Sequence, residues 1–305
     1  MLRRVLIFLF LIGLVNVVSY AEEAQSSAAQ EEWNPPSAGP ITTSTAPLCA
    51  KGEFVIQPLF FYNRTRGSFD SEGHYDSLPE GDSQYQYQGV WFMQYGITDR
   101  LEIDGQLLYQ KNYIKQEGLK AHASGLGDSY LFLRYCIFEE KEWLPHVTGV
   151  FALKAPTGKY QHADPDKLGT DIMGGGSWDQ GIGVILTKRL KPFIFHADTY
   201  YSFSQPTKID DVKTRYANYL NYDIGVEYFL PKGFNLILEA NGFLQGDRWE
   251  DGGRLPSSDI RYLTIAPGIG WSCDKLQTLL AYQRVVIGTN TDANDSVVLT
   301  CVYTF

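Results

Sequence analysis

Apolar and polar side chains alternate along most of the chain after residue 52. In the last nine residues, apolar side chains occupy every second position from Val297 to Phe305, and Thr300 and Thr304 fall between them. Successive side chains of a strand point to opposite faces, so this segment predicts a strand with one apolar face. Such strands form the wall of outer-membrane β-barrels, although a soluble β-protein can also end on one.

The same pattern recurs in segments of ten to fifteen residues between turn signals. We predict twelve strands, near 53–63, 84–96, 101–111, 125–138, 145–155, 178–187, 192–203, 215–230, 234–246, 260–273, 277–288 and 295–305. Short links such as 98–100 alternate with long polar links such as 64–83. Short periplasmic turns opposite long outer loops are typical of outer-membrane barrels, and an even strand count places both barrel ends in the periplasm. The fold class expected for residues 53–305 is therefore all-β, a transmembrane antiparallel β-barrel.

The first 21 residues have the features of a secretory signal peptide. Arg3 and Arg4 precede an apolar run from Val5 to Val18, and Ala21 is the expected cleavage point. The run is shorter than the about 20 residues that a transmembrane helix needs. No other apolar stretch is long enough for a membrane helix, so insertion in a membrane requires a closed barrel. The expected location is the bacterial cell outer membrane.

Residues 22–52 are rich in Ala, Glu, Gln, Ser, Thr and Pro, and Trp33 is the one large aromatic residue among them. This composition favours a flexible periplasmic leader. The alternative is that the segment folds into the barrel as a plug. The sequence leaves both alternatives open.

Charged positions indicate which face of each strand points inward. Glu102 and Asp104 share a parity in a strand whose other parity is apolar, and turning the strand over would place both carboxylates in lipid. The same test places Asp128 inside, and it leaves the strand at 277–288 without an assigned register. The predicted pore-lining charges are Glu102, Asp104, Arg134, Lys154, His196, Asp198, Asp223, Glu227 and Glu239. They either form ion pairs that fill a narrow barrel or line a permeation path.

Composition narrows the partners. The chain is acidic, with a net charge of −9 and 20% charged residues, which argues against nucleic-acid binding. The 14% aromatic content suits interfacial girdles. The expected partners are outer-membrane lipid, including lipopolysaccharide, small-molecule solutes, and the barrel-assembly machinery, which would bind the C-terminal Phe305. No cofactor or metal site is expected, because the four cysteines lack ligand spacing. A disulfide between Cys49 and Cys273, both near the periplasmic rim, is one alternative.

Four motifs occur in a fixed order. They are Tyr95-Gly-Ile-Thr-Asp-Arg-Leu-Glu102, Gly125-Leu-Gly-Asp128, Lys154-Ala-Pro-Thr-Gly-Lys-Tyr160 and Gly174-Gly-Gly-Ser-Trp-Asp-Gln-Gly-Ile-Gly183. From about residue 50 to 305, this succession resembles the outer-membrane proteins grouped under the MetA pathway of phenol degradation, which are described as transporters. The resemblance implies a barrel on the twelve-strand scale and passage of small compounds, including aromatic ones. It supplies no catalytic residue.

Taken from the residues themselves, the motifs are architectural. Thr98 and Asp99 suit a tight turn, and Gly125 and Gly127 allow a bend where Asp128 accepts hydrogen bonds from the turn. The expected function is passive passage of small molecules through an outer-membrane channel. The alternative is a non-conducting structural or adhesin-like barrel that acts through its outer loops. An enzyme is not expected: His196 and Asp198 share one face of a strand, but they lie near the periplasmic end of the lumen.

Overall fold

The computed structural model describes residues 33–37 and 39–305, so the predicted signal peptide lies outside the described residues. No helix in the described ranges is long and apolar enough to cross a membrane. Two short 3-10 helices occur, η1 at Pro165–Lys167 and η2 at Pro231–Gly233.

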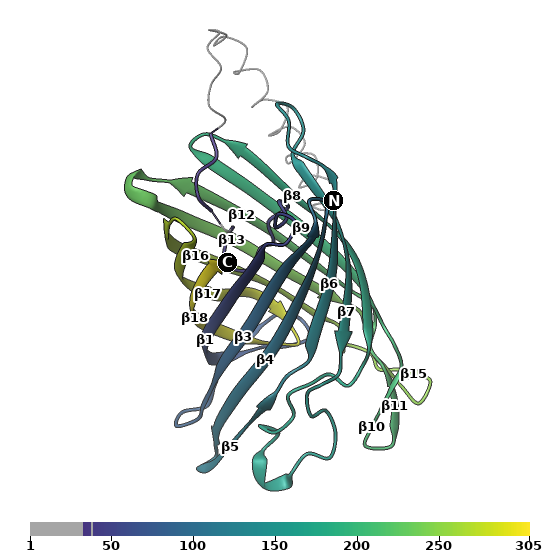
Figure 1. Ribbon diagram of the computed structural model, residues 1–305. Helices are drawn as coiled ribbons and strands as arrows, with labels where there is room; N and C mark the ends of the chain where they lie inside the picture. The colour runs from purple at the N-terminus through teal and green to yellow at the C-terminus, as the bar shows by residue number, and fades with distance from the viewer. Residues whose placement is uncertain (1–32, 38) are drawn as a thin grey trace, which may run out of the picture. The chain divides into compact units, whose positions relative to one another are not determined.

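Antiparallel strands form a closed barrel over residues 54–304, which confirms the predicted fold class (Figure 1). The wall strands are β1 (Phe54–Phe69), β3 (Ser83–Thr98), β4 (Leu101–Gln116), β5 (Leu119–Leu126), β6 (Ser129–Phe138), β7 (His146–Ala155), β8 (Asp179–Leu190), β9 (Phe193–Ser204), β12 (Tyr219–Phe229), β13 (Phe234–Gln245), β16 (Ile260–Cys273), β17 (Leu276–Thr289) and β18 (Thr291–Thr304). Neighbouring wall strands pair along the chain, except that β5 and β6 both pair with β4, and β18 pairs with β1 to close the ring.

Strands β5 and β6 occupy one place in the wall. Strand β4 pairs first with β6, from Leu101 to Gln106, and then with β5, from Tyr109 to Gln116. The chain bends between them at Gly127, whose N–H donates to the carbonyl of Leu108. A Cβ on Gly127 would lie 2.4 Å from the Leu108 side chain, so this close approach requires glycine. Counted this way, the described residues form twelve wall strands, as predicted.

Several strands run further outward than predicted. β1 extends to Phe69, β4 to Gln116, and β5 begins at Leu119, all within segments that the sequence had assigned to loops. Polar residues such as Arg64 and Asn112 continue the ladder, because above the membrane a strand needs no apolar outward face. Four short strands form a separate sheet from two outer loops: β10 (Thr207–Ile209), β11 (Val212–Arg215), β14 (Trp249–Glu250) and β15 (Gly253–Arg254). Strand β2 (Tyr75–Ser77) pairs with the end of β1.

The two faces of the wall have the predicted parity. Phe60, Leu107, Leu131 and Leu299 are each about half exposed on the outer face, which is the lipid face. The register left open by the sequence is settled by pairing with β18: Leu279 lies opposite Thr300 on the inner face, and Leu280 lies outside.

Candidate functional site

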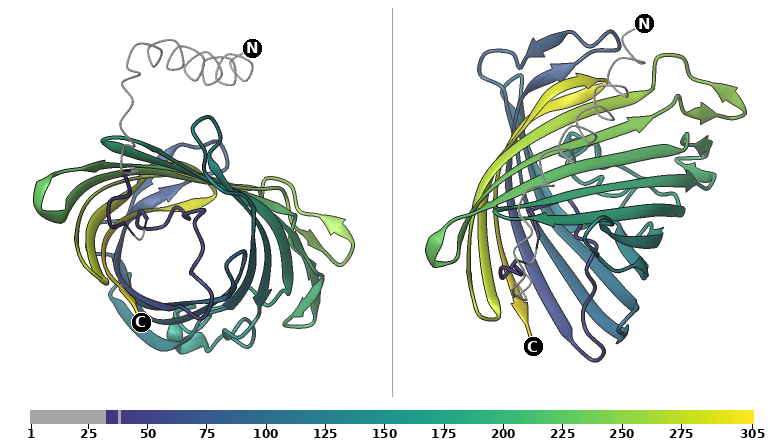
Figure 2. Two further views of the ribbon diagram at one scale, coloured as in Figure 1. Left: turned by 45° about the horizontal axis from the view of Figure 1, so that its top comes forward. Right: turned by 90° about the horizontal axis from the view of Figure 1, so that it is seen from above.

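All nine predicted pore-lining charges lie on inward-facing positions of the wall, and most are buried. The reason for their burial is a chain segment inside the barrel. Residues 39–49 run through the lumen, where Ile41 and Ala46 have almost no exposed surface (Figure 2). We call residues 37–49, without the undescribed residue 38, the luminal segment.

Carboxylates of the wall hold the luminal segment mainly through its backbone N–H groups. Glu239 accepts from the backbone N–H groups of Ile41, Thr42 and Thr43, and its Oε2 lies 2.6 Å from Thr42 Oγ1. Hydrogen bonds from N–H groups to a carboxylate are charge-assisted and stronger than neutral ones. One wall carboxylate thus holds three consecutive residues of the segment.

Two more carboxylates hold the segment further along. Asp198 accepts from Ser44 N at 2.6 Å, and Glu102 accepts from Cys49 N at 2.5 Å. At residues 45 and 46 the wall supplies hydroxyl and guanidinium groups: Thr187 Oγ1 accepts from Ala46 N at 2.9 Å, and Arg134 donates to the Thr45 carbonyl. Carboxylates on several strands therefore bind the backbone of one peptide segment. They do not pair only with basic residues of the wall.

His196 and Asp198 do not form a dyad. His196 Nε2 lies 2.9 Å from Glu227 Oε1, and its Nδ1 lies 3.1 Å from Thr187 Oγ1. Glu227 also accepts from Asn235 Nδ2 at 2.5 Å and from Ser37 Oγ at 2.8 Å. The histidine is thus one member of a buried network that supports the luminal segment, and Asp198 has a different partner.

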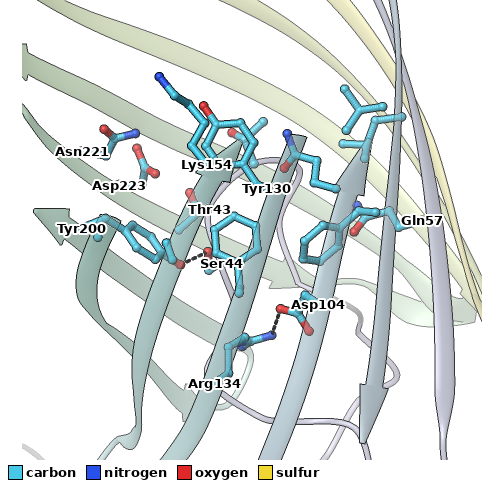
Figure 3. A pocket seen from close by; sticks show the side chains of 18 of the residues that line it. Thr43, Ser44, Gln57, Asp104, Tyr130, Arg134, Lys154, Tyr200, Asn221 and Asp223 are labelled. Carbon is cyan, nitrogen blue, oxygen red and sulfur yellow. Dashed lines mark hydrogen bonds and ion pairs between the residues drawn. The ribbon is translucent and has the colours of Figure 1, made fainter. Parts of the chain in front are cut away.

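Arg134 is a buried cation in the periplasmic half of the lumen. Its Nη1 lies 2.6 Å from Glu102 Oε1 and 3.6 Å from Asp104 Oδ2, so one guanidinium serves two carboxylates; Figure 3 shows the contact with Asp104. All three side chains are almost completely buried. Removing one partner of such a buried group leaves an uncompensated charge, which typically costs about 3–5 kcal/mol.

Lys154 marks the outer half of the lumen. Its Nζ lies 2.5 Å from Asp179 Oδ2 and 3.9 Å from Asp128 Oδ2. Asp179 also accepts from Ser177 Oγ at 2.8 Å and from Tyr219 at 3.1 Å. Asp179 was not among the predicted pore-lining residues, although its inward-facing position at the start of a predicted strand could have identified it.

Asp128 brings three of the four sequence motifs together. Its carboxylate accepts from the backbone N–H groups of Gly158 at 3.2 Å and Gly175 at 2.9 Å. A Cβ on Gly174 would lie 2.4 Å from Asp128 Oδ1, so glycine is required for this approach. The prediction that Asp128 accepts from its own turn is wrong: it fastens the outer loop 156–177 to the wall.

A cavity of about 420 Å³ lies inside the barrel, and residues 40–45 of the luminal segment form part of its lining (Figure 3). Strands β1, β3 and β6 contribute five apolar side chains to the lining, and Gln57, Gln94 and Arg134 lie among them on the same strands. The apolar residues are Leu59, Phe61, Val90, Phe92 and Phe132. The rings of Phe92 and Phe132 pack edge to face with centroids 6.2 Å apart.

Strands β7, β8 and β12 contribute mainly polar side chains to the lining. They are Lys154, Asp179, Tyr219, Asn221 and Asp223, and Asp104 and Gln106 on β4 are polar as well. Tyr200 reaches towards the luminal segment, where its hydroxyl lies 2.9 Å from Ser44 Oγ. Of the nine predicted residues, Asp104, Arg134, Lys154 and Asp223 line this cavity, and none of the aromatic lining residues was assigned from the sequence.

The cysteines are unpaired in the structure. Cys49 is buried on the luminal segment, whereas Cys273 is exposed at the end of β16. The alternative of a disulfide between them is therefore not what the structure shows.

Comparison with known proteins places this geometry among outer-membrane barrels. The fold is similar to the COG4313 outer membrane channel from Pseudomonas putida F1, with a TM-score of 0.73 and 16% identity over 87% of this chain and 100% of that chain. The NanC porin aligns with a TM-score of 0.48 and 10% identity, over 81% of this chain and 98% of its own. Among curated proteins, none matches the sequence significantly.

The closed barrel, whose fold is similar to that of the Pseudomonas putida channel, agrees with the outer-membrane location expected from the alternating strands. A family model described as "Putative MetA-pathway of phenol degradation" matches residues 69–300, which is most of the barrel. The motifs joined at Asp128 lie within that range. The chain belongs to the family of that description.

Proposed function

We propose that the protein is an outer-membrane channel for passive passage of small molecules, including aromatic and hydrophobic ones. The observation that carries the proposal is a cavity of about 420 Å³ whose lining combines aromatic and polar side chains. Ligand pockets typically range from about 300 to 1,000 Å³ and combine apolar walls with a few polar groups. An aromatic ring with a polar substituent fits within this volume and matches the mixed lining.

Two comparisons support this proposal. One solved structure with the same fold is described as an outer membrane channel, and the family description refers to phenol degradation. Phenol is itself an aromatic ring with one polar group. Both facts concern other proteins, and the cavity is what connects them to this chain.

In this proposal, the luminal segment is the plug that the sequence offered as an alternative. Its contacts at Glu102, Asp198 and Glu239 close the periplasmic side of the cavity. The segment is attached to the wall by hydrogen bonds rather than by covalent links. Passage then depends on how far the segment yields or is displaced.

The second candidate is a non-conducting barrel that acts through its outer loops. The observation that favours it is the separate sheet of β10, β11, β14 and β15, which orders two outer loops. In that sheet the Arg215 guanidinium lies 5.6 Å from the centre of the Trp249 ring. An ordered loop surface of this kind suits binding to a macromolecule.

Solute flux into liposomes distinguishes the two candidates. We expect 4-hydroxybenzoate to enter protein-containing liposomes faster than gluconate, an anion of equal charge without a ring. Val90→Trp should slow both fluxes severalfold, because the added ring takes up part of the cavity of about 420 Å³.

The matched control is Leu131→Trp, which adds the same ring to the lipid face. Its flux should equal that of the unaltered protein. Equal flux through the Val90 variant, or no flux through any variant even after deletion of residues 35–49, would contradict the channel and favour the loop-binding barrel.

A further inference from the structure

We infer that the outer face of β1, β3, β4 and β5 is a binding site for the phosphate groups of lipopolysaccharide in the outer leaflet. The outward residues of β4 change character in a fixed order towards the cell exterior. Leu107 is followed by Tyr109, then Lys111 and Lys115. This is the order of hydrocarbon, interface and headgroup that a membrane-spanning strand meets.

Strand register gathers further cations on the same face. Arg64 on β1 lies opposite Tyr85 on β3, which lies opposite Tyr113 on β4. Lys115 on β4 lies opposite Lys120 on β5. We call Arg64, Lys111, Lys115 and Lys120 the basic patch. Three strand spacings of about 4.8 Å make it about 14 Å wide, comparable with a phosphorylated disaccharide.

The charges of the basic patch are not neutralised by the protein. Within residues 33–37 and 39–305, none of its four side chains forms an ion pair with a carboxylate. Asp295 on β18 lies opposite Arg64 in the register, but its carboxylate pairs with Arg66 at 2.8 Å and Arg284 at 3.5 Å, so three arginines surround one acid at this edge. Lysine and arginine in this position attract phosphate, and arginine can bind it in a bidentate manner.

An aromatic surface supports the patch. The rings of Tyr85 and Tyr113 stack with centroids 4.6 Å apart, and His122 stacks on Tyr113 at 5.6 Å. Lys111 Nζ lies 4.9 Å from the centre of the Tyr113 ring. The stack holds the lysine on a flat surface at the level where sugar headgroups begin, next to the exposed Tyr62 and Tyr87.

The patch is confined to one sector of the barrel. On the opposite side, the outward positions of β9, β12 and β13 carry no charged residue along their whole length. At the corresponding height they present side chains such as Phe203, Leu220 and Leu244. A general requirement of the membrane interface would place cations around the whole ring, so this sector has a specific ligand.

Binding of purified lipid A to the detergent-solubilised full chain tests the inference. The variant R64Q/K111Q/K115Q/K120Q should bind diphosphorylated lipid A at least about tenfold more weakly, because each cation near an anionic surface is worth a factor of about five. The charge-keeping variant R64K/K111R/K115R/K120R should bind like the unaltered protein, and dephosphorylated lipid A should bind weakly to all variants.

The matched control is K208Q/K213Q/R215Q/R254Q, which removes the same charge from the sheet of outer loops. It should leave lipid A binding unchanged. Equal affinities of the patch variant and this control would overturn the inference, as would equal binding of phosphorylated and dephosphorylated lipid A. Conductance plays no part in the readout, so failure here leaves the channel proposal intact.

Discussion

The periplasmic and outer halves of the lumen use inward carboxylates differently. In the periplasmic half, Glu239, Asp198 and Glu102 bind N–H groups of the luminal segment. In the outer half, Asp179 binds Lys154 of the wall, and Asp128 binds the backbone of an outer loop. The first arrangement fills part of the barrel, and the cavity lies beside it, lined by residues 40–45 of the luminal segment and by Lys154 and Asp179 of the outer half.

This difference shows that an inward charge does not by itself indicate an open pore. A carboxylate that faces main-chain donors organises a peptide, because N–H groups supply hydrogen bonds without a counter-charge. A carboxylate next to a lysine is neutralised by the wall itself and requires no peptide segment as a hydrogen-bond donor. The function of each half therefore depends on which donor groups lie next to its carboxylates.

Deletion of residues 35–49 should have the largest effect, because it removes the filling of the periplasmic half. We expect single-channel conductance in planar bilayers to rise by about tenfold or more, since twelve strands enclose a lumen wider than side chains alone fill. The control is deletion of residues 22–32, which should leave the conductance unchanged. Unaltered conductance after the longer deletion would show that the luminal segment does not obstruct the path.

Glu239→Gln should have a smaller effect in the same direction. The amide keeps the shape but lacks the charge that strengthens the bonds to Thr42 and Thr43, a loss of about 2 kcal/mol. We expect the segment to become more accessible to protease and the channel to open more often. The matched control Asp179→Asn alters the outer half, so it should change solute selectivity without exposing the segment. Equal proteolysis of both variants would argue against separate roles for the two halves.

The smallest effect concerns the loop that bounds the outer half. Lys159 contacts Asp171 and lowers the pKa of that carboxyl below its ordinary value of 3.8. A depressed pKa contributes stability that is present above the ordinary value and is lost as pH falls through the lowered one. Limited proteolysis of loop 156–177 should therefore be constant from neutral pH to about 4 and should increase only below that range. Faster cleavage already near pH 6 would contradict this assignment.

The wall could be predicted from the sequence, because lipid imposes one rule on every strand. Positions such as Leu101, Leu131 and Leu299 must be apolar, and acids such as Glu102 must then face inward. The continuation of β1 and β4 beyond the membrane was missed, since that rule no longer applies there.

The contents of the lumen could not be predicted in the same way. The partners of Glu239 and Asp198 are backbone N–H groups, which every residue except proline carries and which leave no mark on the sequence. Asp128 likewise binds Gly158 and Gly175, far along the chain. The alternation of side chains predicts which acids face inward. Only the three-dimensional arrangement shows which groups those acids bind.

The pairing of β18 with β1 has a consequence for biogenesis. Strand β1 pairs along one edge, from Val55 to Phe69, with β18, which lies far from it along the chain. A chain that lacks β18 would expose two unpaired edges to hydrocarbon, at several kcal/mol for each unsatisfied group. Insertion of a partial barrel thus has a high energetic cost, and closure of the ring by β18 is the step that permits a stable position in the bilayer.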